Sequence, residues 1–207
     1  MISFEAVLAL AVFAFVSSIT PGPNNLMLMA SGTNFGFARS LPHMLGVALG
    51  FVLMLIVVGS GLGASLQAFP PAMLAIKYLS IAYLLYLAWR TATTAPTIVV
   101  QDTADGEGNA RRPLTFVQAA AFQWVNPKAW TMALTAMAVY LPAGDRVLGI
   151  ALVALVFGVI NLPSVAIWTA GGVQLRRLLH RPKALRAFNV AAALLLVASL
   201  YPMVTAR

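Results

Sequence analysis

The sequence predicts an all-α integral membrane protein with six transmembrane helices, arranged as two inverted three-helix repeats with broken first and fourth spans. The first observation is composition: of 207 residues, 61% are hydrophobic and 9% are charged, whereas about a quarter of a soluble domain is charged. The second is that apolar residues form long runs, separated by short gaps that hold most of the basic residues. The third is that proline and asparagine interrupt two of these runs.

Six spans are expected at about 20 residues for each crossing, at residues 4–36, 42–66, 71–90, 114–140, 147–174 and 184–205. The first must be broken or tilted, because it would be nearly 50 Å long at about 1.5 Å of rise per residue. No charge marks the turn at Phe69-Pro70-Pro71, so a count of five spans stays open. The first run is expected to be a retained span, since it has no basic leader, contains Glu5 and stays apolar past residue 20.

The gaps predict how the chain lies in the membrane, because lysine and arginine gather in cytoplasmic loops. Nine of them fall in the first, third and fifth gaps, and two or three fall on the other side. The basic loops are therefore expected in the cytoplasm and both termini outside, in a bacterial cytoplasmic (inner) membrane. This pattern accounts for the net charge of +8, so the lipid bilayer is the expected partner and nucleic acid is not.

A single transmembrane domain, residues 1–207, is expected, with a polar linker in its middle. The linker, residues 93–112, contains Asp102, Asp105 and Glu107 together with glycine and proline, which predicts a solvated cytoplasmic segment. The spans before it (repeat one, 1–92) and after it (repeat two, 113–207) must enter the bilayer from opposite sides, because each repeat has an odd number of crossings. A shift of about 105 residues places the first break on the second, as in transporters with paired discontinuous helices.

The first break is the segment Pro21-Gly22-Pro23-Asn24-Asn25. Proline removes a backbone donor, and hydrocarbon offers no water to replace a lost partner. Pro23 suits the first position of a new half-helix, so the amides of Asn24, Asn25 and Leu26 are expected to point into the break. Such amides lie at the positive end of the helix dipole and can bind a carboxylate. The alternative is a packing kink whose backbone groups are satisfied by neighbouring helices.

The second break follows Gln123 and Trp124 and contains Asn126, Pro127 and Lys128. A lysine near the centre of an apolar span costs at least about 2.5 to 3.5 kcal/mol. The spans hold no deep Asp or Glu, so the expected partners of Lys128 are helix carbonyls, water or the carboxylate of a ligand. Gln123 and Asn126 would complete a polar pocket, with Trp124 as an aromatic wall. Snorkelling of Lys128 to the membrane surface is the alternative.

Few groups suit other chemistry. His43, at the cytoplasmic start of the second run, is a candidate proton relay, and a histidine that caps the helix at the membrane surface is the alternative. The absence of cysteine excludes disulfides, thiolate catalysis and cysteine metal sites. No cofactor, metal site or catalytic residue is expected, because the spans show no acid and base pair, nucleophile motif or metal cluster.

Two ordered signatures of a known family resemble segments of this chain. The first is similar to Thr20-Pro21-Gly22-Pro23-Asn24-Asn25, Gly36-Phe37-Ala38-Arg39-Ser40, the pair Gly46 and Gly50, and Tyr83-Leu84-Leu85-Tyr86-Leu87-Ala88-Trp89. The second is similar to Phe122-Gln123-Trp124-Val125-Asn126-Pro127-Lys128-Ala129. The family is the lysine exporter (LysE/RhtB) family of amino-acid efflux proteins. Length, hydropathy and the central linker are also similar, so the resemblance covers essentially the whole chain.

The resemblance implies efflux of small amino acids or their derivatives across the cytoplasmic membrane, driven by the proton gradient. The hypothesis for the mechanism is alternating access around a midplane pocket, where backbone amides and Lys128 hold the carboxylate of the substrate and the asparagines meet its amino group. The expected substrate-binding residues are Pro21, Gly22, Pro23, Asn24, Asn25, Gln123, Asn126, Pro127 and Lys128. A divalent-metal or other small-solute exporter and a membrane-embedded enzyme are the alternatives. The choice of amino acid and the formation of a homo-oligomer stay open.

Overall fold

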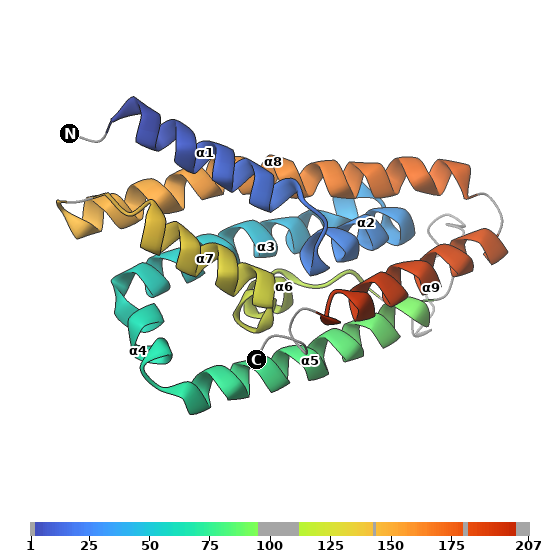
Figure 1. Cartoon of the computed structure of the whole chain (residues 1–207). Helices are drawn as coiled ribbons and strands as arrows, with labels where there is room; N and C mark the ends of the chain where they lie inside the picture. The colour runs from blue at the N-terminus through green and yellow to red at the C-terminus, as the bar shows by residue number, and fades with distance from the viewer. Residues whose placement is uncertain (1–2, 95–111, 143, 180–181, 202–207) are drawn as a thin grey trace.

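The computed structural model describes residues 3–94, 112–142, 144–179 and 182–201, and every regular element among them is a helix (Figure 1). The first half contains α1 (Phe4–Ile19), α2 (Pro23–Phe35), α3 (Phe37–Val57), the π-helical segment η1 (Val58–Leu62), α4 (Gly63–Gln67) and α5 (Pro70–Ala92). The second half contains α6 (Phe116–Phe122), the 3₁₀ segment η2 (Gln123–Val125), α7 (Pro127–Val139), α8 (Arg146–Leu178) and α9 (Pro182–Ala198).

Both predicted breaks are present. The first run is divided into α1 and α2, which are bent by 54° at the break. In the fourth run α6 passes into η2, and the extended backbone of Asn126 then separates η2 from α7. Each new half-helix begins with the expected proline, Pro23 in α2 and Pro127 in α7, at a position where the missing N–H has no role.

The start of the second predicted run is wrong by several residues. Gly36 has a φ of 83° and forms both the end of α2 and the cap of α3, which begins at Phe37 instead of residue 42. Arg39 therefore lies in the first turn of a helix and not in a gap between helices. The positive φ, which glycine adopts without strain, turns the chain within one residue, and hydropathy alone does not report such a turn. Most of the predicted linker, residues 95–111, lies outside the described residues.

Two helical segments in the described part of the chain are long and apolar enough to cross a membrane, namely Phe37–Ser65 and Arg146–Arg177. The bent pair α1 and α2 makes a third candidate if it counts as one span. These helices confirm the prediction of an all-α integral membrane protein.

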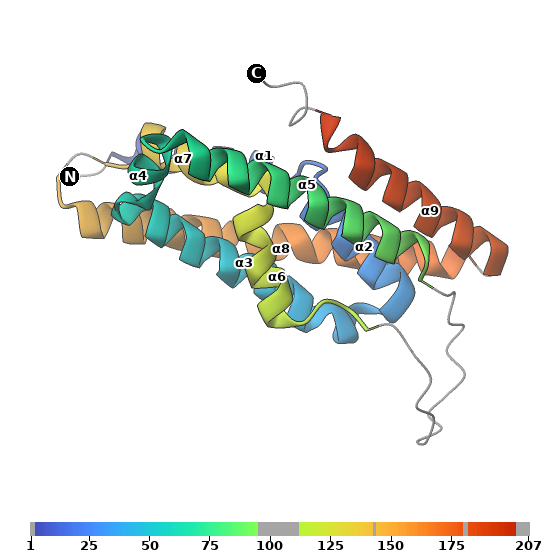
Figure 2. The same ribbon diagram turned by 90° about the horizontal axis from the view of Figure 1, so that it is seen from below.

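The long helix α8 packs against α1, α2 and α3, while α5 and α9 pack against each other (Figures 1 and 2). Helices α2 and α8 approach closely, because a Cβ on Gly172 would lie 2.0 Å from the carbonyl oxygen of Met29. A Cβ on Gly32 would likewise lie 2.1 Å from the carbonyl oxygen of Thr169. Glycine is thus required at both positions for this packing.

The apolar core consists of two clusters of buried side chains. One cluster joins α2, α5 and α9 through residues such as Leu28, Leu84 and Leu196. The other joins α1, α3 and α8 through residues such as Leu10 and Phe157. Figure 1 shows α2 and α7 leaving the middle of the molecule in opposite directions. The first turns of α2 contribute to one cluster and those of α7 to the other.

Candidate functional site

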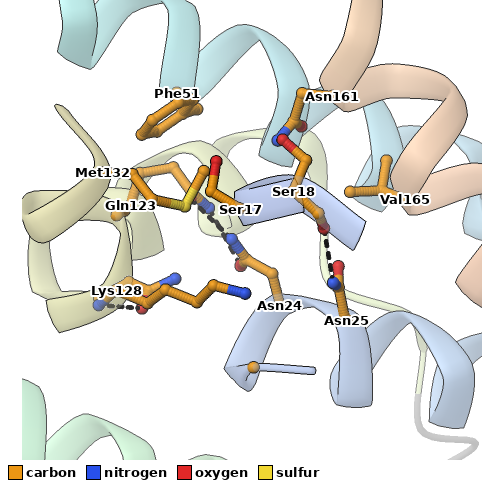
Figure 3. A pocket seen from close by; sticks show the side chains of 13 residues that line it. Ser17, Ser18, Asn24, Asn25, Phe51, Gln123, Lys128, Met132, Asn161 and Val165 are labelled. Carbon is orange, nitrogen blue, oxygen red and sulfur yellow. Dashed lines mark hydrogen bonds between the residues drawn. The ribbon is translucent and has the colours of Figure 1, made fainter. Parts of the chain in front are cut away.

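A polar pocket lies where the two breaks meet (Figure 3). Both breaks line it, the first through Gly22, Asn24 and Asn25 and the second through Gln123, Asn126 and Lys128. The two breaks are about a hundred residues apart in the sequence, so the fold brings together the two segments that were predicted to form one site. The three predicted prolines do not line the pocket. Pro23 and Pro127 begin the half-helices that do.

Lys128 reaches from the second break into the first. Its Nζ donates to the carbonyl oxygen of Thr20 at 2.7 Å, to the Thr20 Oγ1 at 2.9 Å and to the carbonyl oxygen of Pro21 at 3.3 Å. An ammonium group has three N–H donors, and three acceptors surround this one. Lys128 is half-buried and does not snorkel to an end of the molecule. Its partners are two backbone carbonyls and the hydroxyl of Thr20, and carbonyls were among the partners that the sequence left open.

The reach of Lys128 requires the glycine before Pro23. A Cβ on Gly22 would lie 2.7 Å from Cδ and 3.1 Å from Nζ of Lys128. The φ of Gly22 is −176°, an extended conformation that any residue adopts. Glycine is therefore needed here for space and not for backbone conformation.

Other side chains hold the remaining carbonyls at the C-terminal end of α1. Asn25 Nδ2 donates to the carbonyl oxygens of Ser18 and Thr20, both at 2.8 Å. Trp168 Nε1, from α8, donates to the carbonyl oxygen of Ile19 at 2.9 Å. A helix end leaves carbonyls without intrahelical partners, and at this break protein side chains satisfy them. The carbonyls of Ser18, Ile19 and Thr20 therefore have partners within the protein.

The amide side chains of Asn24 and Gln123 form a reciprocal pair across the two breaks. Asn24 Nδ2 donates to Gln123 Oε1 at 2.8 Å, and Gln123 Nε2 donates to Asn24 Oδ1 at 3.2 Å. Gln123 is fully buried and also donates to the carbonyl oxygen of Ala119 at 2.8 Å. This pair and Lys128 are two separate polar links between the breaks.

The N-terminal end of α2 differs from the C-terminal end of α1. Gly22 supplies no side-chain cap, and the backbone N–H groups of Asn24 and Asn25 have no acceptor within the described part of the chain. The expectation for Leu26 is wrong, because its N–H donates to the carbonyl oxygen of Gly22 at 3.0 Å and closes the first turn. Two amides at the positive end of the α2 dipole thus remain for a ligand.

Asn126 is tied to its own half-helix. Its Oδ1 accepts from the backbone N–H of Lys128 at 3.1 Å, so it caps α7. The side chain is almost completely buried. Asn126 therefore fixes the start of α7 and with it the direction in which Lys128 leaves the helix.

The pocket also contains residues that the sequence did not assign to it: Ser17, Ser18, Phe51, Ala129, Met132, Asn161 and Val165. Asn161 Nδ2 donates to Ser18 Oγ at 3.1 Å, the interhelical hydrogen bond expected of a polar residue in an apolar span. The Oδ1 of Asn161 is buried and has no partner in the described residues. A polar residue close to Pro163 in an apolar run was the sequence signal that could have assigned Asn161 to the pocket.

The space at the centre of the pocket is small. Its volume is about 20 Å³, which is enough for about one water molecule. An amino acid needs more room than this, so the pocket in this state has no space for one.

His43 lies outside this pocket, and its side chain caps no helix end among the described residues. It is 2% exposed, and neither ring nitrogen has a hydrogen-bond partner among the described residues. It lines a second cavity between α2, α3 and α5. The described residues contain no group of three or more His, Cys, Asp or Glu side chains that could hold a metal ion.

Comparison with known proteins places the chain among transporters. Residues 15–199 match the LysE type translocator family. A cysteine/O-acetylserine efflux protein of Escherichia coli (strain K12) is 29% identical over 187 residues, which cover 89% of this chain and 90% of that protein. A protein of the same name from Shigella sonnei (strain Ss046) matches to the same extent. No solved structure matches the chain.

The matched region includes both breaks, so it covers the segments on which the predicted family resemblance depends. The resemblance is confirmed, and the relatives' names agree with the predicted amino-acid efflux. The alternative of a membrane-embedded enzyme is wrong, because the family is one of translocators. The chain belongs to the LysE type translocator family.

Proposed function

We propose that this protein exports small amino acids or their derivatives from the cytoplasm through the pocket between the two breaks. Cysteine and O-acetylserine are the first candidates, because the relatives that match most of its length carry these substrates in their names. The observation that carries the proposal is the position of Lys128, an ammonium group held at a helix break by two backbone carbonyls and the hydroxyl of Thr20.

The proposed binding mode uses the different chemistry of the two helix ends. The carboxylate of the substrate accepts hydrogen bonds from the N–H groups of Asn24 and Asn25 and from Lys128, which then gives up one of its carbonyl partners. A charged acceptor strengthens such a bond relative to a neutral carbonyl. The amino group of the substrate donates to oxygens that line the same pocket, among them the unpaired Oδ1 of Asn161.

The proposed alternating access depends on the two links across the breaks. Lys128 joins α7 to the end of α1, and the amide pair of Asn24 and Gln123 joins α2 to η2. The small volume of the pocket describes a state in which both links are closed. A carboxylate that competes for Lys128 weakens one link, and the two halves then separate around the site.

The proposed architecture is six spans in two inverted repeats, residues 1–92 and 113–207, joined by the linker. The half-helices α2 and α7 support it, since each has 13 residues and each begins with proline directly after a break. They also run in opposite directions from the middle of the molecule (Figure 1). Paired half-helices of this kind build the substrate site in other transporters with inverted repeats.

The proposed location is the bacterial cytoplasmic membrane, with the basic loops inside and both termini outside. Basic residues from separate gaps gather at one end of the described structure. A Cβ on Gly36 would lie 4.0 Å from Nη1 of Arg176, and Arg112 lines the cavity that Phe35 also lines. Such a gathering of positive charge is typical of the cytoplasmic side.

Coupling to the proton gradient is proposed to involve His43 as a proton relay. It is the one histidine among the described residues, and the cavity that it lines adjoins the basic end of the molecule. An imidazole changes its charge near neutral pH more readily than any other side chain.

The proposed function is tested by measuring extracellular metabolites in a bacterial strain whose own cysteine exporters are deleted. Expression of the protein is expected to raise extracellular cysteine or O-acetylserine above the level of the empty vector. Expression of Lys128→Met at the same membrane level is expected to leave it unchanged. Export of a metal ion or another solute, with no change in any amino acid, would contradict the proposal.

A further inference from the structure

The cavity that His43 lines lies at the other end of α2 from the break. Its volume is about 60 Å³, against about 20 Å³ at the break. Helices α2, α3 and α5 and the segment after residue 111 enclose it. We call it the basic-end pocket, and its polar residues are Ser31, Asn34, His43, Arg90, Thr91, Thr94 and Arg112.

The first observation that indicates a ligand in this pocket is the environment of His43. The side chain is buried, yet neither Nδ1 nor Nε2 has a hydrogen-bond partner in the described part of the chain. A buried polar group without a partner is rare, because it has lost its hydrogen bonds to water. A neutral imidazole offers one N–H donor and one acceptor, and both are left for a bound molecule.

The hydroxyl groups of the pocket act as acceptors. Ser40 Oγ donates its proton to the carbonyl oxygen of Gly36 at 2.8 Å, so Ser31 must be the donor in their 2.7 Å contact. Thr91 Oγ1 likewise donates to the carbonyl oxygen of Leu87 at 2.8 Å. The lone pairs of Ser31 and Thr91 therefore suit a donor such as an ammonium group.

The positive groups of the pocket act as donors. Arg90 Nη2 donates to the backbone carbonyl oxygen of Arg112 at 2.8 Å, and both arginines line the pocket. Guanidinium groups pair with carboxylates in a fixed planar geometry. The α2 helix ends beside the pocket, and the negative end of its dipole favours a positive group there.

A zwitterionic α-amino acid fits this combination of one carboxylate-binding wall and one ammonium-binding wall. We propose that the basic-end pocket is a second binding site for the exported amino acid, filled before the substrate reaches the pocket at the breaks. The proposal rests on the proposed function. One helix connects the sites, because α2 lines the first pocket with its N-terminal residues and the second with Ala30, Ser31 and Asn34.

The test uses the two histidines of the chain. His180→Asn leaves His43 as the only histidine, so ¹⁵N-histidine labelling gives the signals of one ring. The protein is placed in phosphatidylcholine nanodiscs and titrated with L-cysteine, which forms no disulfide with a chain that lacks cysteine. Binding of ³⁵S-cysteine to the same samples is measured in parallel.

Cysteine is expected to shift the His43 ring signals in a saturable manner, both with Lys128 present and in Lys128→Met. Arg112→Gln is expected to raise the half-saturation concentration at least tenfold, while the matched control Arg39→Gln leaves it unchanged. Arg39 is exposed and does not line the pocket. Cysteine methyl ester, which lacks the carboxylate, is expected to cause no shift at the same concentrations.

Three results would overturn the second site and leave the first intact. In one, ³⁵S-cysteine binds and Lys128→Met abolishes that binding, while the His43 signals do not shift even when the binding is saturated. Another is a His43 shift that disappears in Lys128→Met, because the ring would then report only the pocket at the breaks. The third is an equal shift with the methyl ester, or one caused by phosphatidylglycerol without amino acid. No binding of cysteine anywhere would overturn both sites for this substrate.

Discussion

The Nζ of Lys128 lies 2.7 Å from the carbonyl oxygen of Thr20, although 108 residues separate them. The contact joins the start of one half-helix to the end of another helix at the opposite break. It satisfies two groups that would each be costly alone in a membrane, a lysine and an unpaired carbonyl. In the proposed binding mode the same ammonium group pairs with the carboxylate of the substrate. Closure of the pocket and binding of the substrate therefore compete for Lys128.

Gly22→Ala is predicted to displace Lys128. The added methyl group would lie 2.7 Å from Cδ of Lys128, and overpacking of this kind costs about 1 to 3 kcal/mol. Thermal unfolding in detergent and efflux rate are the measurements, and both are expected to fall.

The double variant Gly22→Ala with Lys128→Ala is the control for this prediction. It removes the atoms that the methyl group meets, so the alanine at position 22 is expected to add no further loss. A loss in stability from Gly22→Ala that is the same in both backgrounds would show that Lys128 is not the neighbour that matters.

The amide pair of Asn24 and Gln123 is predicted to show coupling in a double-mutant cycle. Each side chain is the partner of the other, so the effects of Asn24→Ala and Gln123→Ala on unfolding should not add. A coupling energy of about 0.5 to 3 kcal/mol is expected for residues in contact. Additive effects would mean that the pair contributes no link between the breaks.

Two neighbouring glycines of α8 give a matched test of the packing of α2. Gly172→Ala is predicted to destabilise the protein strongly, because its Cβ would lie 2.0 Å from the carbonyl oxygen of Met29, a backbone atom that cannot swing away. Gly171→Ala places its methyl group in open space and is predicted to leave stability unchanged. Melting temperatures in detergent compare the two, and equal effects would contradict the close approach of α2 and α8.

Arg146 is predicted to hold the π-helical segment after α3. Its Nη2 and Nε donate to the carbonyl oxygen of Gly59 at 2.7 and 3.1 Å, next to Gly61, whose φ is 124°. Arg146→Gln is expected to speed hydrogen exchange of residues 58–62, since a charged hydrogen bond contributes about 1.5 to 3 kcal/mol. Arg177→Gln, at the other end of α8, is the control, and an equal change in both variants would refute the role.

The sequence predicted the two breaks and their meeting because proline and asparagine are energetically costly within an apolar membrane span, unless they lie at a break that is buried in protein. It also predicted the first positions of both half-helices, which follow from the missing N–H of Pro23 and Pro127. It could not predict that Lys128 points at Thr20, since that direction depends on the cap that Asn126 provides and on the space at Gly22.

The sequence also could not predict which residues of other helices line the pocket. Phe51 and Met132 line the pocket as ordinary apolar residues of ordinary apolar runs, and only the packing of α3, α7 and α8 distinguishes them. The burial of His43 was not predicted, because the second run was expected to start at residue 42. The turn at Gly36 begins α3 earlier, so His43 lies a full turn inside the helix and is buried.

The most direct test measures efflux of ³⁵S-cysteine from proteoliposomes that contain equal amounts of inserted protein. Lys128→Met is predicted to slow efflux by about tenfold or more, because a lost charged hydrogen bond of about 1.5 to 3 kcal/mol corresponds to such a factor. Lys183→Met, which removes an exposed ammonium group away from the pocket, is predicted to keep the rate of the unmodified protein. Efflux by Lys128→Met at the unmodified rate would contradict a substrate site at the meeting of the two breaks.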